Sequence, residues 1–300
     1  MAVRVVTDSS ADLPSDLANN ADITVIPCNV VIDDVSYKDG VDITPDEFYQ
    51  RLATSSRLPT TAQPSVADFQ AVYQNLLDEG HTVVSIHVSG KLSGTVNAAD
   101  QARAALSDPA AVEIVDSQLA SISLGLVSLA ASKRAEEGVT IAQLAQQVRD
   151  QLPRTDCMFA LDTLEYLQKG GRIGRAQAFV GAILSVKPIL KLQDGEAHPL
   201  ERSRNMDRAL RRLAELARGQ APLTQLAVVY STESQRAQDL RKQLGDLMPE
   251  KEIIIARFGS TLGTYVGPKA FGVALTSVTC CIPQFANWTG AEQECATGGA

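Results

Sequence analysis

The sequence contains no run of apolar residues as long as the ~18–20 residues that a bilayer-spanning helix needs. It also has no excess of positive charge, because the formal net charge is -8. An acidic chain of this kind argues against a nucleic-acid-binding surface. The opening Met-Ala-Val-Arg-Val-Val lacks the charged-then-apolar order of a secretory signal peptide. We therefore expect a cytoplasmic protein.

Cysteine and histidine are scarce, with five and three residues respectively. The cysteines are Cys28, Cys157, Cys280, Cys281 and Cys295. Their number is odd and their spacing matches no zinc-binding pattern, so we assign them no disulfide, metal or catalytic role. Adjacent Cys280 and Cys281 lie in an apolar, strand-like run and are interpreted as small core residues. No cofactor is expected.

The length and composition fit two soluble domains of ordinary size. The chain has 300 residues, of which 45% are hydrophobic and 21% charged. Strand-like apolar runs alternate with helical patterns up to Pro153, and Thr44-Pro-Asp-Glu47 is typical of a helix start. This alternation predicts an N-terminal α/β domain over residues 1–153, with a mostly parallel sheet and flanking helices.

The remainder of the chain predicts a second α/β domain over residues 154–282. Its sheet is expected to be mixed or antiparallel, because strand-like Lys187–Lys191 and Glu196–Leu200 flank an Asp-Gly turn. Residues 283–300 show no periodicity and predict a poorly ordered tail.

One loop that could carry function lies within Ser-Ile-His-Val-Ser-Gly-Lys-Leu-Ser-Gly-Thr, residues 85–95. The pattern predicts a buried strand over His81–Val88 and an alanine-rich helix over Thr95–Leu106, with Ser93 as the helix N-cap. The first N–H groups of a helix carry partial positive charge and bind anions. Alternatively, the Ser and Gly residues serve turn geometry alone.

A second loop, Pro59-Thr-Thr-Ala-Gln-Pro-Ser65, also gathers hydroxyl groups. Pro64 restricts its backbone, and Ser65 is expected to cap a helix that starts near Val66. By itself the segment fits a linker with an N-cap. Together with the first loop, it predicts half of a hydroxyl-lined cradle that includes Thr61.

The segment Thr7-Asp-Ser-Ser10 follows the first apolar strand, Ala2–Val6. Ser9 and Ser10 there fit turn and capping chemistry. They also stand at the carboxyl end of a strand, which is where α/β sheets bind ligands. Both interpretations stay open at this point.

Five segments, in this order, carry a resemblance to a known family. They are Val6-Thr-Asp-Ser-Ser10, Thr61-x-Gln-Pro-Ser65, Leu92-Ser-Gly-Thr95, Leu161-Asp-Thr-Leu-Glu-Tyr-Leu-x-Lys-Gly-Gly-Arg-Ile173 and Lys187-Pro-Ile-Leu190. The sequence resembles the DegV family of bacterial fatty-acid-binding proteins, over residues 3 to 282. The resemblance implies two α/β domains with a long-chain fatty acid between them.

The resemblance also implies the site. Thr61 and Ser93 are expected to hold the carboxylate, because hydroxyls can donate hydrogen bonds to it. The ligand-binding residues as a whole are expected to be Thr61, Ser93, Gly94, Thr95, Ser9, Ser10, Thr264 and Tyr265. The family pattern Gly-Thr-His-x-Gly-Pro-Gly is altered here, with Tyr265 in place of the histidine and Lys269 in place of the last glycine. The Tyr265 hydroxyl either replaces the histidine's hydrogen bond or that bond is lost.

The acyl chain is expected to lie in an apolar tunnel. Its walls are predicted to come from helices rich in Ala, Val, Leu and Ile, such as Leu119–Ala131 and Ala176–Leu184. The first of these is apolar nearly all round, which predicts a buried helix. Both stretches also fit an ordinary hydrophobic core.

The resemblance further implies a carrier that presents its fatty acid to a separate fatty acid kinase, which makes an acyl phosphate for phospholipid synthesis. Arg172, Arg204 and Arg208 are candidates for the kinase contact. Alternatively, Arg172 caps a helix or pairs with Asp162 or Glu165, and the basic stretch after it is a solvated face. The same basic stripe also suits a transient contact with an anionic membrane surface.

A rival function is a serine hydrolase or acyltransferase that uses Ser93 with His87. Against it, residues 88–93 lack the Gly-x-Ser-x-Gly spacing of a nucleophile elbow. A phosphate- or nucleotide-binding module ranks third, because the sequence contains no P-loop or dinucleotide fingerprint.

Overall fold

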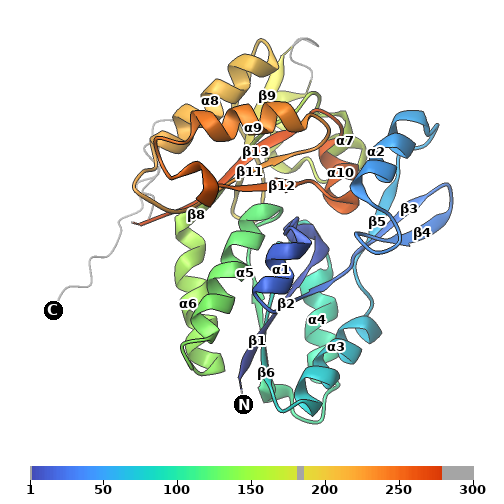
Figure 1. Cartoon of the computed structure of the whole chain (residues 1–300). Coiled ribbons are helices and arrows are strands. Elements are labelled where there is room, and N and C mark those ends of the chain that lie inside the picture. The colour runs from blue at the N-terminus through green and yellow to red at the C-terminus, as the bar shows by residue number, and fades with distance from the viewer. Residues whose placement is uncertain (1, 181–185, 279–300) are drawn as a thin grey trace.

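The computed structural model of the chain describes residues 2–180 and 186–278. Within these residues the strands form three sheets. A parallel sheet lies near the N-terminus, a larger mixed sheet lies above it in Figure 1, and a small antiparallel sheet projects to one side. The predicted fold, two α/β units with one mostly parallel and one mixed sheet, is confirmed.

The first sheet is parallel throughout and has the strand order β2-β1-β6-β7. Its strands are β1 (Val3–Asp8), β2 (Ile23–Ile26), β6 (Thr82–His87) and β7 (Val112–Asp116). One face is covered by α1 (Ser15–Asn20), α5 (Ile122–Ala135) and α6 (Ile141–Gln151), and the other by α3 (Val66–Asp78) and α4 (Thr95–Ala104). Burial on both faces explains why these strands are nearly continuous apolar runs.

The second sheet has the order β10-β9-β8-β13-β11-β12, in which β11 and β12 are parallel and the other neighbours antiparallel. Its strands are β8 (Thr155–Ala160), β9 (Lys187–Gln193), β10 (Glu196–Ser203), β11 (Leu223–Tyr230), β12 (Ile254–Arg257) and β13 (Phe271–Ser277). Helices α8 (Met206–Arg218) and α9 (Ser234–Gln243) cover its outer face. Along β8, Met158 and Ala160 face these helices, whereas Cys157 and Phe159 face the first half of the molecule.

Helix α5 lies between the two large sheets. One side of it packs on β1, and the other side packs on β11 and β13. The hydroxyls of Ser123 and Ser128 donate to carbonyls three and four residues earlier, so the buried helix leaves neither group unpaired. The prediction that this segment is buried is confirmed, although the helix begins at Ile122 rather than at Leu119.

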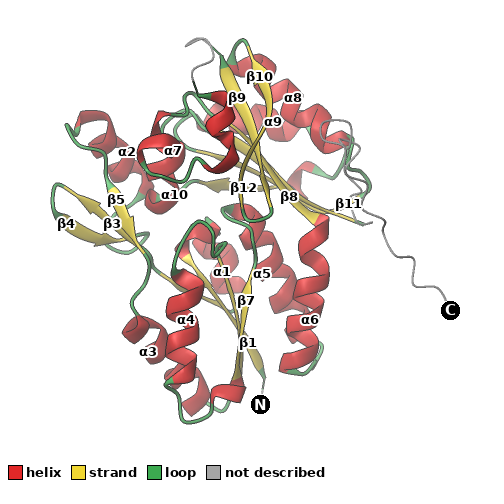
Figure 2. Ribbon diagram, turned by 180° about the vertical axis from the view of Figure 1, so that it is seen from behind, coloured by secondary structure: helices red, strands yellow, loops and turns green. Residues whose placement is uncertain are grey.

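Shorter helices complete the described chain. The remaining α-helices are α2 (Pro45–Thr54), α7 (Glu165–Lys169) and α10 (Ser260–Val266). The 3₁₀ helices are η1 (Ser9–Ala11), η2 (Pro109–Ala111), η3 (Leu152–Arg154), η4 (Gly174–Phe179) and η5 (Glu250–Glu252). The proposed domain boundary after residue 153 falls within η3, which connects α6 to β8. Figure 2 shows α7 and α10 side by side next to α2.

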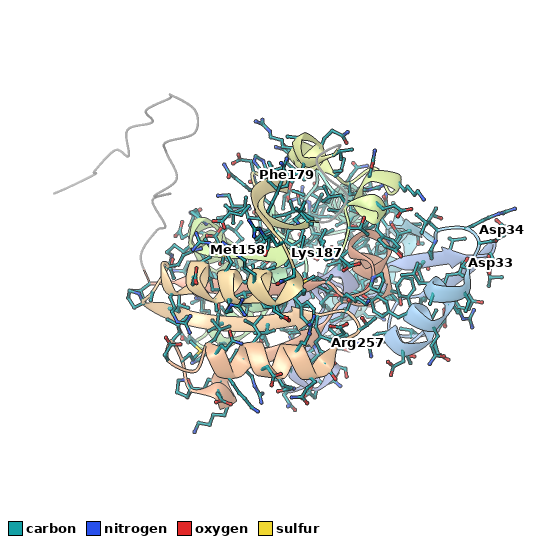
Figure 3. The ribbon with its side chains drawn as sticks, turned by 90° about the horizontal axis from the view of Figure 1, so that it is seen from above. Asp33, Asp34, Met158, Phe179, Lys187 and Arg257 are labelled. Carbon is teal, nitrogen blue, oxygen red and sulfur yellow. The ribbon has the colours of Figure 1, made fainter. Side chains whose placement is uncertain are left out.

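The small antiparallel sheet, in the order β4-β3-β5, departs from the predicted loops. Its strands are β3 (Asn29–Ile32), β4 (Val35–Lys38) and β5 (Thr60–Ala62). The chain leaves the first sheet at Pro27, whose missing N–H ends the ladder. Asp33 and Asp34 turn the hairpin with φ of 50° and 64° and project away from the body in Figure 3. The sequence predicts a loop at Thr61. The segment instead forms β5, because it pairs with β3, a strand that lies well before it in the chain.

Two predicted helix starts are confirmed, and one cap is corrected. Thr44 and Ser65 each form a capping box, accepting from the N–H three residues on while that residue's carboxylate accepts from the cap N–H. Ser93 is not the N-cap of α4. Gly94 holds that position, and the Ser93 hydroxyl instead accepts from the Thr95 N–H at 3.3 Å.

The apolar helix expected over Ala176–Leu184 is also corrected. Residues 174–179 form a 3₁₀ helix, and residues 181–185 lie outside the described residues. The predicted tail over 283–300 and the interpretation of Cys280 and Cys281 lie outside them as well. Across the described ranges, no helix combines the length and apolar character needed to cross a membrane.

Candidate ligand-binding site

A cavity opens between the two halves of the molecule, with about 920 Å³ of empty space when its open mouth is included. Its lining comes from β5, β8, β9, β10, α7 and α10, from η1, and from loop residues that include those after β6 and just before α5. The apolar and sulfur-containing lining residues are Cys28, Ala62, Val88, Leu92, Ala120, Cys157, Phe159, Leu167, Leu192, Ala197, Phe258, Leu262 and Val266. The polar ones are Ser10, Thr61, Gln63, Ser93, Ser121, Arg172, Thr261 and Tyr265.

The mouth of the cavity is built from long-range contacts. The Thr61 hydroxyl on β5 is hydrogen-bonded to the Tyr265 hydroxyl on α10. The Arg172 guanidinium lies over the Tyr265 ring, 5.2 Å from its centroid. It also donates to the carbonyls of Leu92 at 3.2 Å and Gly170 at 2.8 Å. Arg172 thereby ties the loop that carries Ser93 to the α7–α10 side of the mouth.

The chemistry of this mouth suits an anion that accepts hydrogen bonds. Thr61, Ser93 and Tyr265 offer hydroxyl donors, and Arg172 adds one exposed positive charge. Behind the mouth the walls are mostly aliphatic and aromatic. A ligand with a carboxylate at one end and a hydrocarbon chain behind it matches both regions.

Five of the predicted functional residues line the cavity: Thr61, Ser93, Ser10, Tyr265 and Arg172. The structure therefore brings together the segment with Thr61 and the loop with Ser93, as predicted.

Four other predicted ligand-binding residues support the site without lining it. Thr95 is buried and its hydroxyl is bonded to that of Ser93 at 2.8 Å. Gly94 leaves room for the side chain of Gln63, which a Cβ would overlap. The Thr264 hydroxyl donates to the carbonyl of Ser260 within α10. These three act on the packing around the cavity.

Ser9 is the fourth of these residues, and its side chain is hydrogen-bonded to residues that flank the small sheet. Its hydroxyl donates to Asp39 at 3.1 Å and accepts from the Cys28 N–H at 3.0 Å. Cys28 precedes β3 and Asp39 follows β4, so the two bonds hold that end of the small sheet against the end of β1.

The predicted partner-binding arginines do not lie together. Arg172 is at the mouth, whereas Arg204 and Arg208 lie at the start of α8, which covers the opposite face of the second sheet. Part of the basic stretch is neutralised, since Arg212 pairs with Glu201 at 2.7 Å and Arg218 pairs with Asp246 at 2.7 Å. Arg204 and Arg208 remain exposed.

Three buried carboxylates, Asp8, Asp12 and Asp39, stand behind the inner end of the cavity. Asp39 accepts the Ser9 hydroxyl and the N–H groups of Ser260 and Thr261, at 2.9 and 3.1 Å. It thus attaches the first turn of α10 to the small sheet. Within the described residues, no cluster of His, Cys, Asp or Glu side chains is placed to hold a metal ion.

Asp12 joins three segments of the fold. It accepts the Gly259 N–H at 2.8 Å and the Ser121 hydroxyl at 2.6 Å, from residues on either side of the interface. Burial raises the pKa of Asp12 well above its ordinary value, and the nearby charges of Asp39 and Asp8 add to the rise, against the lowering effect of the two hydrogen bonds.

His87 has the surroundings of a structural residue. It is fully buried, with Nδ1 2.9 Å from Asp8 and Nε2 2.6 Å from the Ser85 hydroxyl, which itself accepts from Tyr73. Burial raises the pKa of Asp8, but the hydrogen bond and charge of His87, with bonds from Ser10 and Val88, leave it lowered overall. The side chains of Asp8, His87 and Ser85 are aligned like a catalytic triad, yet none of the three is exposed.

The proposed pairing of Ser93 with His87 is wrong in this structure. Both ring nitrogens of His87 already face Asp8 and Ser85, and Ser93 is bonded to Thr95 instead. Close sequence positions suggested the pair, but His87 points from the buried strand into the first half's core, where it meets the Phe69 ring edge-on. His87 is thus a buried strand histidine with a hydrogen-bond partner at each ring nitrogen.

Several lining residues were not predicted. Cys28 and Cys157 are free thiols at the cavity wall, and burial raises the pKa of each, to about 12 for Cys157. Thr261 lies within the hydroxyl-rich segment before Tyr265, and its spacing from Tyr265 on one helix face could have identified it. The apolar walls come mainly from β8, β9, β10 and α10. From the predicted wall segment Leu119–Ala131, only Ala120 and Ser121, which precede α5, line the cavity.

Comparison with known proteins connects this cavity to a family. The family model described as "Uncharacterised protein, DegV family" matches residues 2–278. The chain belongs to the DegV family. A DegV domain-containing protein of Streptomyces coelicolor is 36% identical over 280 residues, which cover 92% of this chain and 98% of that protein.

Solved DegV structures share the fold over nearly the whole chain. A fatty-acid-binding DegV family protein from Thermus thermophilus is 33% identical, with a TM-score of 0.85 over 93% of this chain and all of that one. DegV of Bacillus subtilis, a fatty acid binding protein, is 29% identical, with a TM-score of 0.83 over 92% of this chain and 99% of that one. Two DegV proteins with this architecture therefore bind fatty acids.

Proposed function

We propose that this DegV protein binds a long-chain fatty acid, with the carboxylate at the mouth and the acyl chain along the apolar walls. The observation that carries the proposal is that one continuous cavity has hydroxyl groups and Arg172 at one end and an aliphatic and aromatic interior. The fatty-acid-binding relatives support the same ligand class.

The apolar walls and the polar mouth are expected to contribute different amounts of binding free energy. Burying ~15 methylenes at ~0.8 kcal/mol each contributes ~12 kcal/mol before the entropy cost of binding. Hydrogen bonds to a charged group contribute only ~1.5–3 kcal/mol each, and they must offset the desolvation of the carboxylate. The apolar walls supply affinity, and Thr61, Ser93 and Arg172 fix the position and direction of the head group.

The protein acts as a carrier that presents the carboxylate to a separate fatty acid kinase, which phosphorylates it to an acyl phosphate for phospholipid synthesis. The exposed position of Arg172 beside the mouth supports this part of the proposal. A guanidinium there can contact both the carboxylate and the phosphoryl group arriving from the kinase. Arg204 and Arg208 form a second candidate surface, on the far side of the sheet, for a protein or an anionic membrane.

The ligand is tested by denaturing extraction of the purified protein and mass spectrometry of the extract. We expect a long-chain fatty acid in stoichiometric amount. Thr61→Val removes one hydroxyl at nearly constant volume and should weaken palmitate binding by about tenfold. Thr60→Val is the matched control, because exposed Thr60 is the neighbouring residue on β5 and does not line the cavity. A protein that holds no fatty acid and takes up no palmitate overturns the proposal.

The kinase step is tested by measuring acyl phosphate formation with a fatty acid kinase, ATP and the loaded carrier. Arg172→Gln should lower the rate at saturating carrier while fatty acid is still extracted from it. Arg175→Gln is the control, since Arg175 is exposed, pairs with Glu196 and does not line the cavity. Equal rates for the two variants would contradict a role for Arg172 at the kinase contact.

A further inference from the structure

The cavity has a second polar region, formed by Thr261, Ser10 and Ser121, at its inner end. These residues are buried, with 7%, 2% and 3% of their surfaces exposed, whereas Gln63 and Arg172 at the mouth are exposed. Thr261 precedes Tyr265 by one turn of α10, so their Cβ atoms are roughly 5–6 Å apart. The inner region is therefore a few carbon atoms away from a carboxylate held at the mouth.

Thr261 differs from the other two residues in its hydrogen bonding. The hydroxyls of Ser10 and Ser121 donate to Asp8 and Asp12. The Thr261 hydroxyl is buried at the cavity wall and has no hydrogen-bond partner among the described residues. A buried hydroxyl left unpaired is unfavourable, and such groups in native proteins normally find a partner. Because Thr261 lines the cavity, a rotation about its Cα–Cβ bond turns the hydroxyl toward a ligand there.

The charges behind this region determine what kind of partner fits. Each of the three residues is hydrogen-bonded to a different buried aspartate, with the Thr261 N–H donating to Asp39 at 3.1 Å. Asp8 has a lowered pKa and is ionised at neutral pH. A second carboxylate is repelled by such surroundings, whereas a neutral hydroxyl is not. A hydroxyl can also donate to Thr261 and accept from it.

We infer that Thr261 is a specificity-determining residue that binds a hydroxyl group carried on the acyl chain, a few carbons from the carboxylate. The inference rests on the proposed fatty acid site and adds a ligand class to it, the hydroxy fatty acids. An unsubstituted chain leaves the Thr261 hydroxyl unpaired, and a suitably placed hydroxyl removes that cost.

The test compares dissociation constants for palmitate, 3-hydroxypalmitate and 5-hydroxypalmitate, with 16-hydroxypalmitate as the ligand whose hydroxyl lies too far away. The wild-type protein and Thr261→Val are measured by calorimetry or by displacement of a fluorescent fatty acid. Valine keeps the shape of threonine and leaves the N–H bond to Asp39 in place. Thr261→Ser is the matched variant that keeps the hydroxyl.

We expect Thr261→Val to lower the preference for the better of the two near-carboxyl hydroxy acids over palmitate by about tenfold, the effect of one hydrogen bond. Thr261→Ser should retain that preference, and 16-hydroxypalmitate should show no change. A preference that is the same in wild type and Thr261→Val overturns the inference while leaving the fatty acid site intact. Equal weakening of palmitate and hydroxy acids in Thr261→Val overturns it too, because the carboxylate itself would then sit at Thr261. Failure of the wild type to bind palmitate would instead overturn the proposed function.

Discussion

The hydroxyls of Thr61 and Tyr265, 204 residues apart in the sequence, are hydrogen-bonded to each other at the rim of the cavity. Thr61 belongs to the small sheet and Tyr265 to α10, so the rim is closed by two elements that meet only in the folded chain. The Arg172 guanidinium lies over the same tyrosine ring. Tyr265 therefore positions both a hydroxyl donor and a positive charge around the expected carboxylate.

Replacing Tyr265 with phenylalanine removes that hydroxyl and keeps the ring beneath Arg172. We expect palmitate binding to weaken by about threefold to tenfold, because Thr61 loses the partner that orients it. Thermal unfolding should change little. Tyr37→Phe is the control, since the hydroxyl of Tyr37 on β4 accepts from Arg51 on α2 and neither residue lines the cavity. Unchanged affinity for palmitate would show that Tyr265 acts through its ring alone.

Asp12 makes folding stability depend on pH in a direction that can be tested. Its pKa is raised by burial above the unfolded value of ~3.9, so the folded state binds this proton more tightly. The resulting contribution is fully present below about pH 4 and is lost as pH rises through the folded pKa. Asp12→Asn should therefore flatten the fall in the free energy of unfolding over that window, measured by urea denaturation at several pH values.

Asparagine is a close substitute for protonated Asp12. Its amide oxygen can still accept the Gly259 N–H, its NH₂ can donate to Ser121, and it tolerates the φ of 48° at this position. Asp12→Ala is the contrasting variant, expected to lose about 1–3 kcal/mol at every pH because Gly259 and Ser121 lose their acceptor. The same slope in wild type and Asp12→Asn would contradict the assignment.

The buried Asp8–His87–Ser85 arrangement should stabilise the fold and catalyse nothing. His87→Gln removes the partner of a fully buried carboxylate and should cost about 3–5 kcal/mol in the free energy of unfolding. The wild-type protein should not hydrolyse p-nitrophenyl esters. Ester turnover that disappears in Ser85→Ala would establish a hydrolase and refute the structural role.

Two constraints favour glycine at position 267, its backbone conformation and the lack of space for a Cβ. Its φ is 70°, and a Cβ there would overlap the ring of Tyr166. Gly138 has a similar φ of 77° with open space around it, so Gly138→Ala measures backbone strain alone, about 1–2 kcal/mol. Gly267→Ala should cost about 1–3 kcal/mol more, as overpacking does. Equal losses for the two variants in urea unfolding would mean that Tyr166 moves aside freely.

The elements that were predicted well are set by interactions between residues that are close in the sequence. The capping boxes at Thr44 and Ser65 join residues three positions apart, and the hairpin of β9 and β10 is set by its Asp-Gly turn. Local chemistry of this kind is readable without a structure. It also singled out the hydroxyl-rich segments that contain Thr61 and Ser93, although it predicted neither the strand at Thr61 nor the Gly94 cap of α4.

The features that were missed depend on contacts between distant segments. Strand β5 has three residues and forms only because β3 is there to pair with it. Asp39, whose carboxylate holds the start of α10, is 221 residues from Ser260. Ser93 and His87 illustrate the opposite error. They are only six positions apart in the sequence, yet their side chains lie in different environments and do not meet. Neither the hydrophobic pattern nor the secondary-structure propensity of a segment shows which distant segment it will contact.

Helix α5 has a consequence for how the molecule can be divided. Its side chains belong to the same core as β1 on one side and β11 and β13 on the other. A fragment that stops after α6 would retain α5 with an apolar flank uncovered, which favours aggregation. The two α/β halves are separate in sheet topology but not as excisable modules, so shuffling or expressing them singly would break a hydrophobic core that they share.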